Sequence, residues 1–430
     1  MIPLKKSPGL RWGIAVLLSA AIAISYFDRQ TLSIAVKAIQ SDIPITNKQF
    51  AGLGTAFLAA YALMYAGGGK LIDVLGARRG FFLIMLFWSL ACASHGIAAT
   101  FGMLMVSRFL LGMGEGGGFP AATKAVAEWF PVRDRSTAMG IINAGTAVGG
   151  VLAAPLIALI LRFASWPWVF YASGSAGLLW TVWWLRSYYA PSVHPRISAS
   201  EREELKEIMA AEESKGPSLS WFTLFSFPQV WGLVSAKFLT DAAWYFYMLW
   251  LPKYLYDVRG FDVKSVGLYG WMPFAAAGIG CLAGGWSSSW LIRRGYSLNF
   301  ARKLALGVSA GLMPVILFVT MSPVYVAIAL FCVAYFGQQS WSTLVMVLPA
   351  DLFPRRSVGS VAGLVGFGGA MGGVVWGQIV GWMLDDLKTG YGPVFAIAST
   401  FHVIAFVIIL LTIRVVQPVD ASRLAPAVAA

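Results

Sequence analysis

The chain has 430 residues, of which 58% are apolar and 12% are charged, with a mean hydropathy of +0.71. A water-soluble protein of this composition would expose large apolar patches, which excludes a soluble enzyme and, despite a formal net charge of +13, a nucleic-acid-binding protein. The three cysteines and three histidines are scattered, without the spacing of a metal site or a disulfide framework. We therefore expect an integral membrane protein with no metal and no cofactor.

Twelve apolar segments follow one another, each near the roughly 20 residues that cross a hydrocarbon core. The first follows Lys5, Lys6 and Arg11, and eleven more come after it, so we interpret it as an uncleaved span and not as a signal peptide. The expected spans are residues 11–36, 48–69, 80–99, 103–127, 137–161, 167–187, 228–256, 265–288, 303–321, 323–348, 358–384 and 391–415.

A polar stretch between the sixth and seventh spans divides the chain. We expect an all-α membrane protein with an N-terminal six-helix bundle in residues 1–187, a cytoplasmic linker in 188–226 and a C-terminal six-helix bundle in 227–430. Within the linker, Ser200 and Glu203 have the spacing of a capping box, which predicts a short charged helix with a solvated face.

The distribution of cations sets the orientation. With the N-terminus inside, twenty-one Lys and Arg lie in the inner loops, the termini and the adjoining span ends, against seven on the outer side. By the positive-inside rule, both termini are cytoplasmic.

The two halves repeat. Residues 128–131 (EWFP) resemble residues 351–354 (DLFP), 223 positions later, and Gly140 matches Gly363 in the same register. The match is imperfect, since Asn143 meets Gly366. Two parallel repeats around a site at the middle of the membrane are typical of transporters.

Two apparent nucleotide motifs do not fit their surroundings. Residues 112–117 have the G-x-G-x-x-G pattern but lie inside an apolar span, where small residues indicate close helix packing. Gly69 and Lys70 lack the upstream glycine of a P-loop, so ATP hydrolysis is not expected. Without a catalytic constellation, we predict that the protein is not an enzyme.

The candidate functional residues are charges at membrane depth. Each costs roughly 2.5–3.5 kcal/mol to insert and is therefore a functional candidate. They are Asp28 and Arg29 in the first span, Arg108 and Glu115 in the fourth, and Lys237 and Asp241 in the seventh. Lys124, near the end of the fourth span, is interpreted as snorkelling to the interface. Purely structural salt bridges are the alternative interpretation of the six charges.

The six charges sum to zero, as a low-dielectric site requires. If the carboxylate of an anionic substrate pairs with an arginine, one internal carboxylate loses its partner, and uptake of a proton restores neutrality. Charge balance alone thus predicts that an anion is transported together with a proton.

Aromatic and amide side chains supply candidate contacts to a sugar. Tyr26 and Tyr61 lie near the middle of their spans, and Trp244 follows Asp241 on the seventh span, although most aromatic residues here are packing or interface residues. Gln338 and Gln339 form a polar cluster with Ser340 in the tenth span.

Several motifs resemble the major facilitator superfamily. Residues 69–79 resemble its signature loop between helices 2 and 3, with Asp73, Arg78 and Arg79 in the gating positions. A weaker second copy at residues 285–294 has Ser289 where the acid is expected. Arg108 with Gly112 resembles the helix-4 motif.

Further motifs are similar to the anion:cation symporter branch: residues 26–29 (YFDR), 128–131, 250–252 (WLP), and Arg108 with Glu115. Lys237, Asp241, Trp244 and residues 270–273 (GWMP) look closest to bacterial hexuronate transporters. The resemblance implies that Arg29 binds the substrate carboxylate, with Tyr26 and Tyr61 nearby, and that Asp28 and Glu115 are protonated. It also implies that Arg108 exchanges with Glu115 as a partner and that Lys237 contacts substrate. A role of Asp241 in proton coupling is our own inference from its charge.

We expect a proton-coupled symporter that imports a sugar-acid anion, a hexuronate such as glucuronate or galacturonate, by alternating access. It would work as a monomer in the bacterial inner membrane, with the sugar acid, the proton and lipid as its partners. The alternative is an organic-anion exchanger or efflux carrier. A membrane-embedded sensor or enzyme is a third possibility, which the missing catalytic constellation disfavours.

Overall fold

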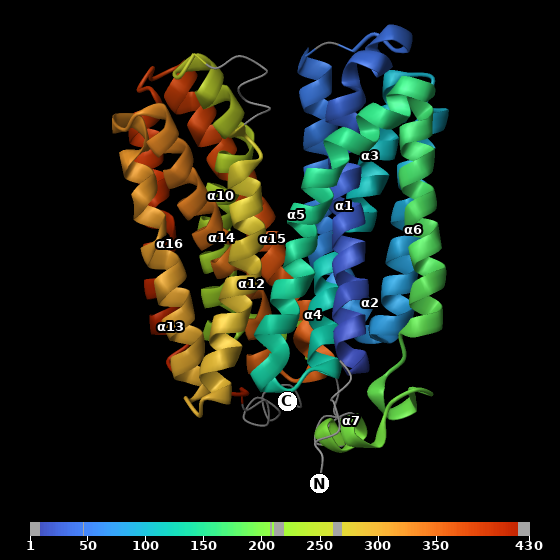
Figure 1. Ribbon diagram of the computed structural model, residues 1–430, viewed down its shortest axis with the longest axis vertical. Helices are drawn as coiled ribbons and strands as arrows, with labels where there is room; N and C mark the ends of the chain where they lie inside the picture. The colour runs from blue at the N-terminus through green and yellow to red at the C-terminus, as the bar shows by residue number, and fades with distance from the viewer. Residues whose placement is uncertain (1–8, 46, 207–208, 210–218, 261–268, 420–430) are drawn as a thin grey trace.

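The computed structural model describes residues 9–45, 47–206, 209, 219–260 and 269–419, and Figure 1 shows them as two groups of long helices standing side by side. Parts of the expected linker (207–208 and 210–218) and the start of the eighth expected span (265–268) lie outside the described residues. The first group contains α1 (Leu10–Asp42), α2 (Asn47–Ser94), α3 (Phe101–Glu115), α4 (Gly118–Trp129), α5 (Val132–Phe163) and α6 (Pro167–Ser187).

Short elements connect the first group to the second: the 3-10 turn η2 (Pro191–Val193), α7 (Ala199–Glu204) and α9 (Trp221–Phe225). Another 3-10 turn, η1 (His95–Ile97), joins α2 to α3 within the first group. The second group contains α10 (Pro228–Asp257), α12 (Met272–Arg293), α13 (Leu298–Gly311), the 3-10 stretch η3 (Met313–Met321), α14 (Val324–Leu352), α15 (Arg355–Asp385) and α16 (Tyr391–Thr412).

Four expected spans differ in detail from the observed helices. The second and most of the third lie in α2, which breaks at Gly76 with φ 76°, a left-handed conformation that glycine adopts without a steric cost. The fourth is divided into α3 and α4, and the ninth continues from α13 into η3. Seven helical stretches of the described chain are long and apolar enough to cross a membrane, which makes this a multi-pass membrane protein.

The sequence repeat appears as two matching interfaces between the groups. Helix α5 packs against α12, and α2 packs against α15. A Cβ atom at Gly140 of α5 would lie 2.5 Å from the carbonyl oxygen of Cys281, and one at Gly363 of α15 would lie 2.5 Å from that of Tyr65. Both matched glycines therefore allow helix backbones of different groups to touch.

Polar contacts join the groups at the end of the molecule where α1 and α5 begin, which we call the linker end. Asp73 accepts hydrogen bonds from the backbone N–H groups of Gly359 (3.1 Å) and Ser360 (2.7 Å). Lys124 donates to Asp73 at 2.7 Å and to the carbonyl of Arg355 at 2.6 Å. The snorkelling interpretation of Lys124 is therefore wrong, because its ammonium is buried in a contact between the groups.

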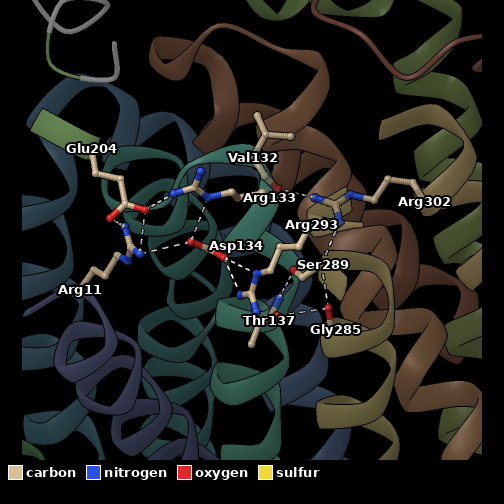
Figure 2. A network of polar contacts seen from close by, with 11 residues as sticks. Arg11, Val132, Arg133, Asp134, Thr137, Glu204, Gly285, Ser289, Arg293 and Arg302 are labelled. Carbon is tan, nitrogen blue, oxygen red and sulfur yellow. Dashed lines mark hydrogen bonds and ion pairs between the residues drawn. The ribbon is translucent and has the colours of Figure 1, made fainter. Parts of the chain in front are cut away.

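The second copy of the signature loop makes a neutral version of this contact. Ser289 stands where the first copy has Asp73, and its hydroxyl accepts from the backbone N–H of Thr137 at 3.2 Å. The charged contact here is made instead by Arg293, which binds Asp134 at 2.6 Å (Figure 2). A buried carboxylate, Asp351, binds both Arg135 (3.1 Å) and Arg302 (2.8 Å).

The linker helix α7 is tied to the first group and is only partly solvated. Its N-cap is Ser198 and not Ser200 as expected, because the Ser198 hydroxyl accepts from the N–H of Glu201. Glu201 is buried and accepts from the N–H groups of Leu10 and Arg11, both at 3.1 Å. These bonds satisfy donors at the start of α1 that have no partner within the helix.

Candidate functional site

A cavity of about 40 Å³ lies between the two helix groups. Its walls come from α1, α2, α4 and α5 of the first group and from α10, α14 and α15 of the second. Seven residues singled out from the sequence line it: Tyr26, Tyr61, Lys237, Asp241, Trp244, Gln338 and Gln339. The cavity surface is therefore largely polar, although it lies deep in an apolar protein.

An ion pair between α1 and α3 lies beside this cavity. Arg29 Nε donates to Glu115 Oε2 at 2.7 Å, and the hydroxyl of Ser25 donates to the same oxygen at 2.7 Å. The guanidinium carbon of Arg29 lies 4.7 Å from the ring centre of Tyr26 and 4.5 Å from that of Tyr61. Such a position over two aromatic rings holds a cation in place without neutralising it.

The glycines of α3 and the turn after it allow close packing of the segment that carries Glu115 against α2. A side chain at Gly112 would clash with the carbonyl of Phe57, and a Cβ atom at Gly116 would lie 2.6 Å from the carbonyl oxygen of Tyr61. The G-x-G-x-x-G pattern thus brings α3 and the following turn against α2, as expected for close packing.

Of the six predicted charges, only Lys237 and Asp241 line the cavity, whereas Asp28, Arg29, Arg108 and Glu115 do not. Asp28 is buried inside the first group, where Trp88 Nε1 donates to it at 2.7 Å and Ser173 also donates. Arg108 is buried too, and its Nε and Nη2 have no hydrogen-bond partner among the described residues. The six charges therefore do not share one void. The pair of Arg29 and Glu115 is separated from the cavity by the rings of Tyr26 and Tyr61, on which Arg29 lies.

The second pair lies within one helix. Lys237 Nζ donates to Asp241 Oδ1 at 2.8 Å, one turn away on α10, and to the hydroxyl of Ser342 on α14 at 2.8 Å. Gly369 on α15 leaves room for the carboxylate, because a side chain there would clash with Asp241. Both charged side chains and Ser342 line the cavity.

The gating residues have different surroundings. Asp73 bridges the groups, as described above, whereas Arg78 stays within the first group. Arg78 Nη2 donates to the carbonyl of Leu185 at 2.7 Å, and its guanidinium lies 4.0 Å from the ring centre of Tyr189. Arg79 is exposed.

Sequence reasoning missed several cavity residues. Tyr65, Asn143, Tyr245 and Ser342 also line the cavity, and Asn143 Nδ2 donates across the groups to Thr343 Oγ1 at 3.1 Å. A mismatch in the repeat marked this place, since Asn143 and Gly366 occupy equivalent positions and both line the cavity. A side chain at Gly366 would clash with the ring of Tyr65. This mismatch between the two sequence repeats therefore gives the two sides of the cavity different side chains.

A pattern typical of esterases does not build a catalytic site. Residues 307–311 (GVSAG) have the G-x-S-x-G spacing, but Ser309 lies within α13 and not at a strand-to-helix turn. Its hydroxyl donates to the carbonyl of Ala305 at 2.8 Å and meets the hydroxyl of Ser340 at 2.7 Å.

Two repeated helix groups that enclose a polar cavity, joined at one end by breakable polar contacts, define a membrane transporter. Residues 18–377 match the Major Facilitator Superfamily, and the chain belongs to this family of transporters. It is therefore not an enzyme.

Curated relatives and solved structures agree with this assignment. The chain is 30% identical to the hexuronate transporter of Escherichia coli K12 over 412 residues, 94% of both chains. It is 32% identical to the galacturonate transporter of Dickeya chrysanthemi over 330 residues, 75% of this chain and 95% of that one. The structure of a proton:xylose symporter superimposes with a TM-score of 0.72 at 14% identity, covering 94% of this chain and 96% of that one. This last likeness shows the shared fold.

Proposed function

We propose that the protein is a proton-coupled symporter that imports a sugar-acid anion, specifically a hexuronate such as glucuronate or galacturonate. The names of its relatives support the substrate class, since they include hexuronate, galacturonate and D-galactonate transporters. The proton coupling is argued from the charges at the cavity.

The pair of Arg29 and Glu115 is the observation that carries the proposal. Of the two side chains, Arg29 keeps 19% of its surface exposed whereas Glu115 keeps none, so a carboxylate that passes Tyr26 and Tyr61 and reaches the pair meets the cation first. An arginine offers a planar fork that matches a carboxylate. When the substrate takes over this fork, Glu115 loses its counterion in a buried site.

A proton then restores the charge balance. A buried carboxylate without a counterion is far more costly than a neutral carboxyl group, so Glu115 binds a proton as the substrate binds Arg29. Glu115 Oε1 has no hydrogen-bond partner among the described residues, and neither do Nε and Nη2 of Arg108. We propose that Arg108 receives Glu115 when Arg29 holds the substrate, and that Asp28 is a further proton site.

The opposite wall binds the sugar hydroxyls. Gln338, Gln339 and the pair of Lys237 and Asp241 offer both donors and acceptors there. We propose that Trp244, Tyr26 and Tyr61 contact the apolar faces of the sugar ring, because aromatic side chains combine a flat surface with a polar edge.

Transport requires the two groups to move. A cavity of about 40 Å³ holds about three water molecules and is far too small for a hexuronate, so the groups must part to admit one. We propose that residues 1–187 and 227–430 are two six-helix bundles that rock about the site, with twelve membrane crossings and both termini in the cytoplasm. The contacts of Asp73 and of Asp134 at the linker end then form the cytoplasmic gate, with Arg78 and Arg79 beside it. The transporter works as a monomer in the inner membrane.

Uptake by proteoliposomes tests the function. Vesicles with an acidic outside and no internal substrate should accumulate galacturonate or glucuronate, and a proton carrier should abolish the accumulation. Uptake that needs internal substrate but no proton gradient would show an anion exchanger instead. The absence of any flux of either hexuronate would overturn the proposed substrate class.

A further inference from the structure

We propose that His402 is a positioning residue that orients the amide of Gln338, so that this amide presents only hydrogen-bond donors to the substrate. The inference rests on the proposed function, because Gln338 is one of the residues that would contact a sugar acid. It assigns a role to a helix, α16, that has no residue on the cavity surface.

His402 is an unexpected residue at its position. It lies in α16, a strongly apolar helix, and its side chain is completely buried. A polar ring at membrane depth costs free energy unless a partner compensates it, so its presence calls for a specific contact. His402 has such a partner in Gln338 on α14, which lines the cavity.

The contact between them fixes the tautomer of the ring. Nε2 of His402 meets Oε1 of Gln338, and an amide oxygen only accepts hydrogen bonds, so Nε2 carries the hydrogen. Nδ1 has no partner among the described residues. In the neutral ring this atom is only an unused acceptor, whereas protonation would bury an N–H group without an acceptor and place a second cation near Lys237.

The ring itself is held in place. Trp341 lies against it with ring centres 5.7 Å apart at 73°, an edge-to-face arrangement. Trp341 is in turn anchored, because its Nε1 donates to the hydroxyl of Thr240 at 3.2 Å. The donor that reaches Gln338 thus has a fixed direction.

A fixed donor on one side of an amide determines what the other side offers. Since the oxygen of Gln338 is occupied by His402, its NH₂ group faces the cavity and offers two donors and no acceptor. The substrate atom at this point must therefore be an acceptor, which in a sugar acid is a carboxylate or hydroxyl oxygen. A free amide could rotate and accept as readily as it donates, which would weaken the selection.

Gln339 provides an internal control. It also lines the cavity, but nothing in the described part of the chain fixes its amide. If His402 acts through Gln338, substitutions at these two positions will not be additive, because residues that act through one another share a single effect. Substitutions at His402 and Gln339 will be additive.

The test measures KM and Vmax of galacturonate and glucuronate uptake in proteoliposomes. His402→Leu should raise KM about threefold to tenfold, the loss expected for one neutral hydrogen bond, with Vmax within about twofold. It should also reduce any difference between the KM values of the two epimers. His402→Gln should restore both, because the glutamine NH₂ reaches about as far as Nε2 of histidine.

Two double variants complete the double-mutant cycles of His402 with Gln338 and of His402 with Gln339. His402→Leu should add nothing to Gln338→Leu but should have its full effect when added to Gln339→Leu. Additive effects with Gln338→Leu, or a normal KM in His402→Leu, would overturn the inference while leaving the proposed function intact.

A second measurement needs no substrate. The ¹⁵N NMR signals of the ring, assigned by comparison with His402→Gln, should show a protonated Nε2 and an unprotonated Nδ1. A doubly protonated ring, or a hydrogen on Nδ1 alone, would overturn the inference even if the protein transports neither hexuronate.

Discussion

The two ion pairs beside the cavity have almost the same length but very different settings. Arg29 and Glu115 are 2.7 Å apart and belong to α1 and α3, whereas Lys237 and Asp241 are 2.8 Å apart on one turn of α10. A pair within one helix stays together when helices move as rigid bodies. A pair between helices depends on the position of both, so a shift of one helix against the other or a competing carboxylate separates it.

The two pairs also differ in which partner, the cation or the carboxylate, is the more exposed. In the first pair the cation is the more exposed partner, whereas in the second Asp241 keeps 14% of its side chain exposed and Lys237 only 6%. The more exposed partner is therefore a cation in the first pair and a hydrogen-bond acceptor, on the cavity surface, in the second. Under the proposed function, Arg29 would meet the substrate carboxylate, and Asp241, paired with Lys237, would meet a sugar hydroxyl.

The largest effect is expected from Arg29→Lys. An ammonium cannot form the two parallel hydrogen bonds of the guanidinium fork, so substrate recognition should be lost, with KM raised at least about a hundredfold. Uptake at varied hexuronate concentration measures this. An unchanged KM would remove Arg29 from the binding site and with it the main distinction between the two pairs.

Glu115→Gln separates binding from proton coupling. The variant keeps a neutral side chain at this position, so it should retain hexuronate counterflow but lose accumulation driven by a pH gradient. Uptake by the wild type should rise as the outside pH falls, and that of the variant should be flat. Normal proton-driven accumulation in Glu115→Gln would contradict its role as the proton acceptor.

Asp241→Asn should have a moderate effect. Lys237 keeps its hydrogen bond to Ser342 but loses its charged partner, so KM should rise about threefold to tenfold through the altered sugar contact. Accumulation driven by the pH gradient should persist because Glu115 is intact. If it is lost as well, the second pair also carries protons, as the sequence first suggested.

Glu204 serves as the reference outside the membrane and should show the smallest effect. Partial burial raises the pKa of Glu204, but hydrogen bonds and charges from Arg11 and Arg133 lower it by more, so its pKa lies below the ordinary value (Figure 2). A depressed pKa stabilises the fold above the pKa of the unfolded chain, about 4.3, and this stabilisation is lost as the pH falls through the folded value.

The variant Glu204→Gln should therefore have a free energy of unfolding that is lower at pH 7 by under about 1 kcal/mol, because the pair is partly exposed. Its melting temperature should lie slightly below that of the wild type. The difference should disappear in acid, and hexuronate transport should be unchanged. Melting curves of the purified protein at both pH values measure this. A large loss of transport would instead make the linker helix part of the gate.

Much of this molecule could be predicted from local patterns. The positions of the helices follow from runs of apolar residues, and Gly112 predicted close packing because a glycine in a membrane helix leaves its backbone open to a neighbour. The pairing of Lys237 with Asp241 follows from helical spacing alone. Lys124 was misread because its partner Asp73 lies 51 residues away on another helix.

The sequence by itself determined that the chain is an all-helical, multi-pass membrane protein with two related halves and six charges at membrane depth, because apolar length, spacing and repetition are local properties. Only the tertiary structure decided which of these charges meet. Asp28 and Arg29 are neighbours in the chain, yet one accepts from Trp88 inside the first group and the other pairs with Glu115 beside the ring of Tyr61. The direction of a side chain depends on which helices surround it, and spacing along one helix does not contain that information.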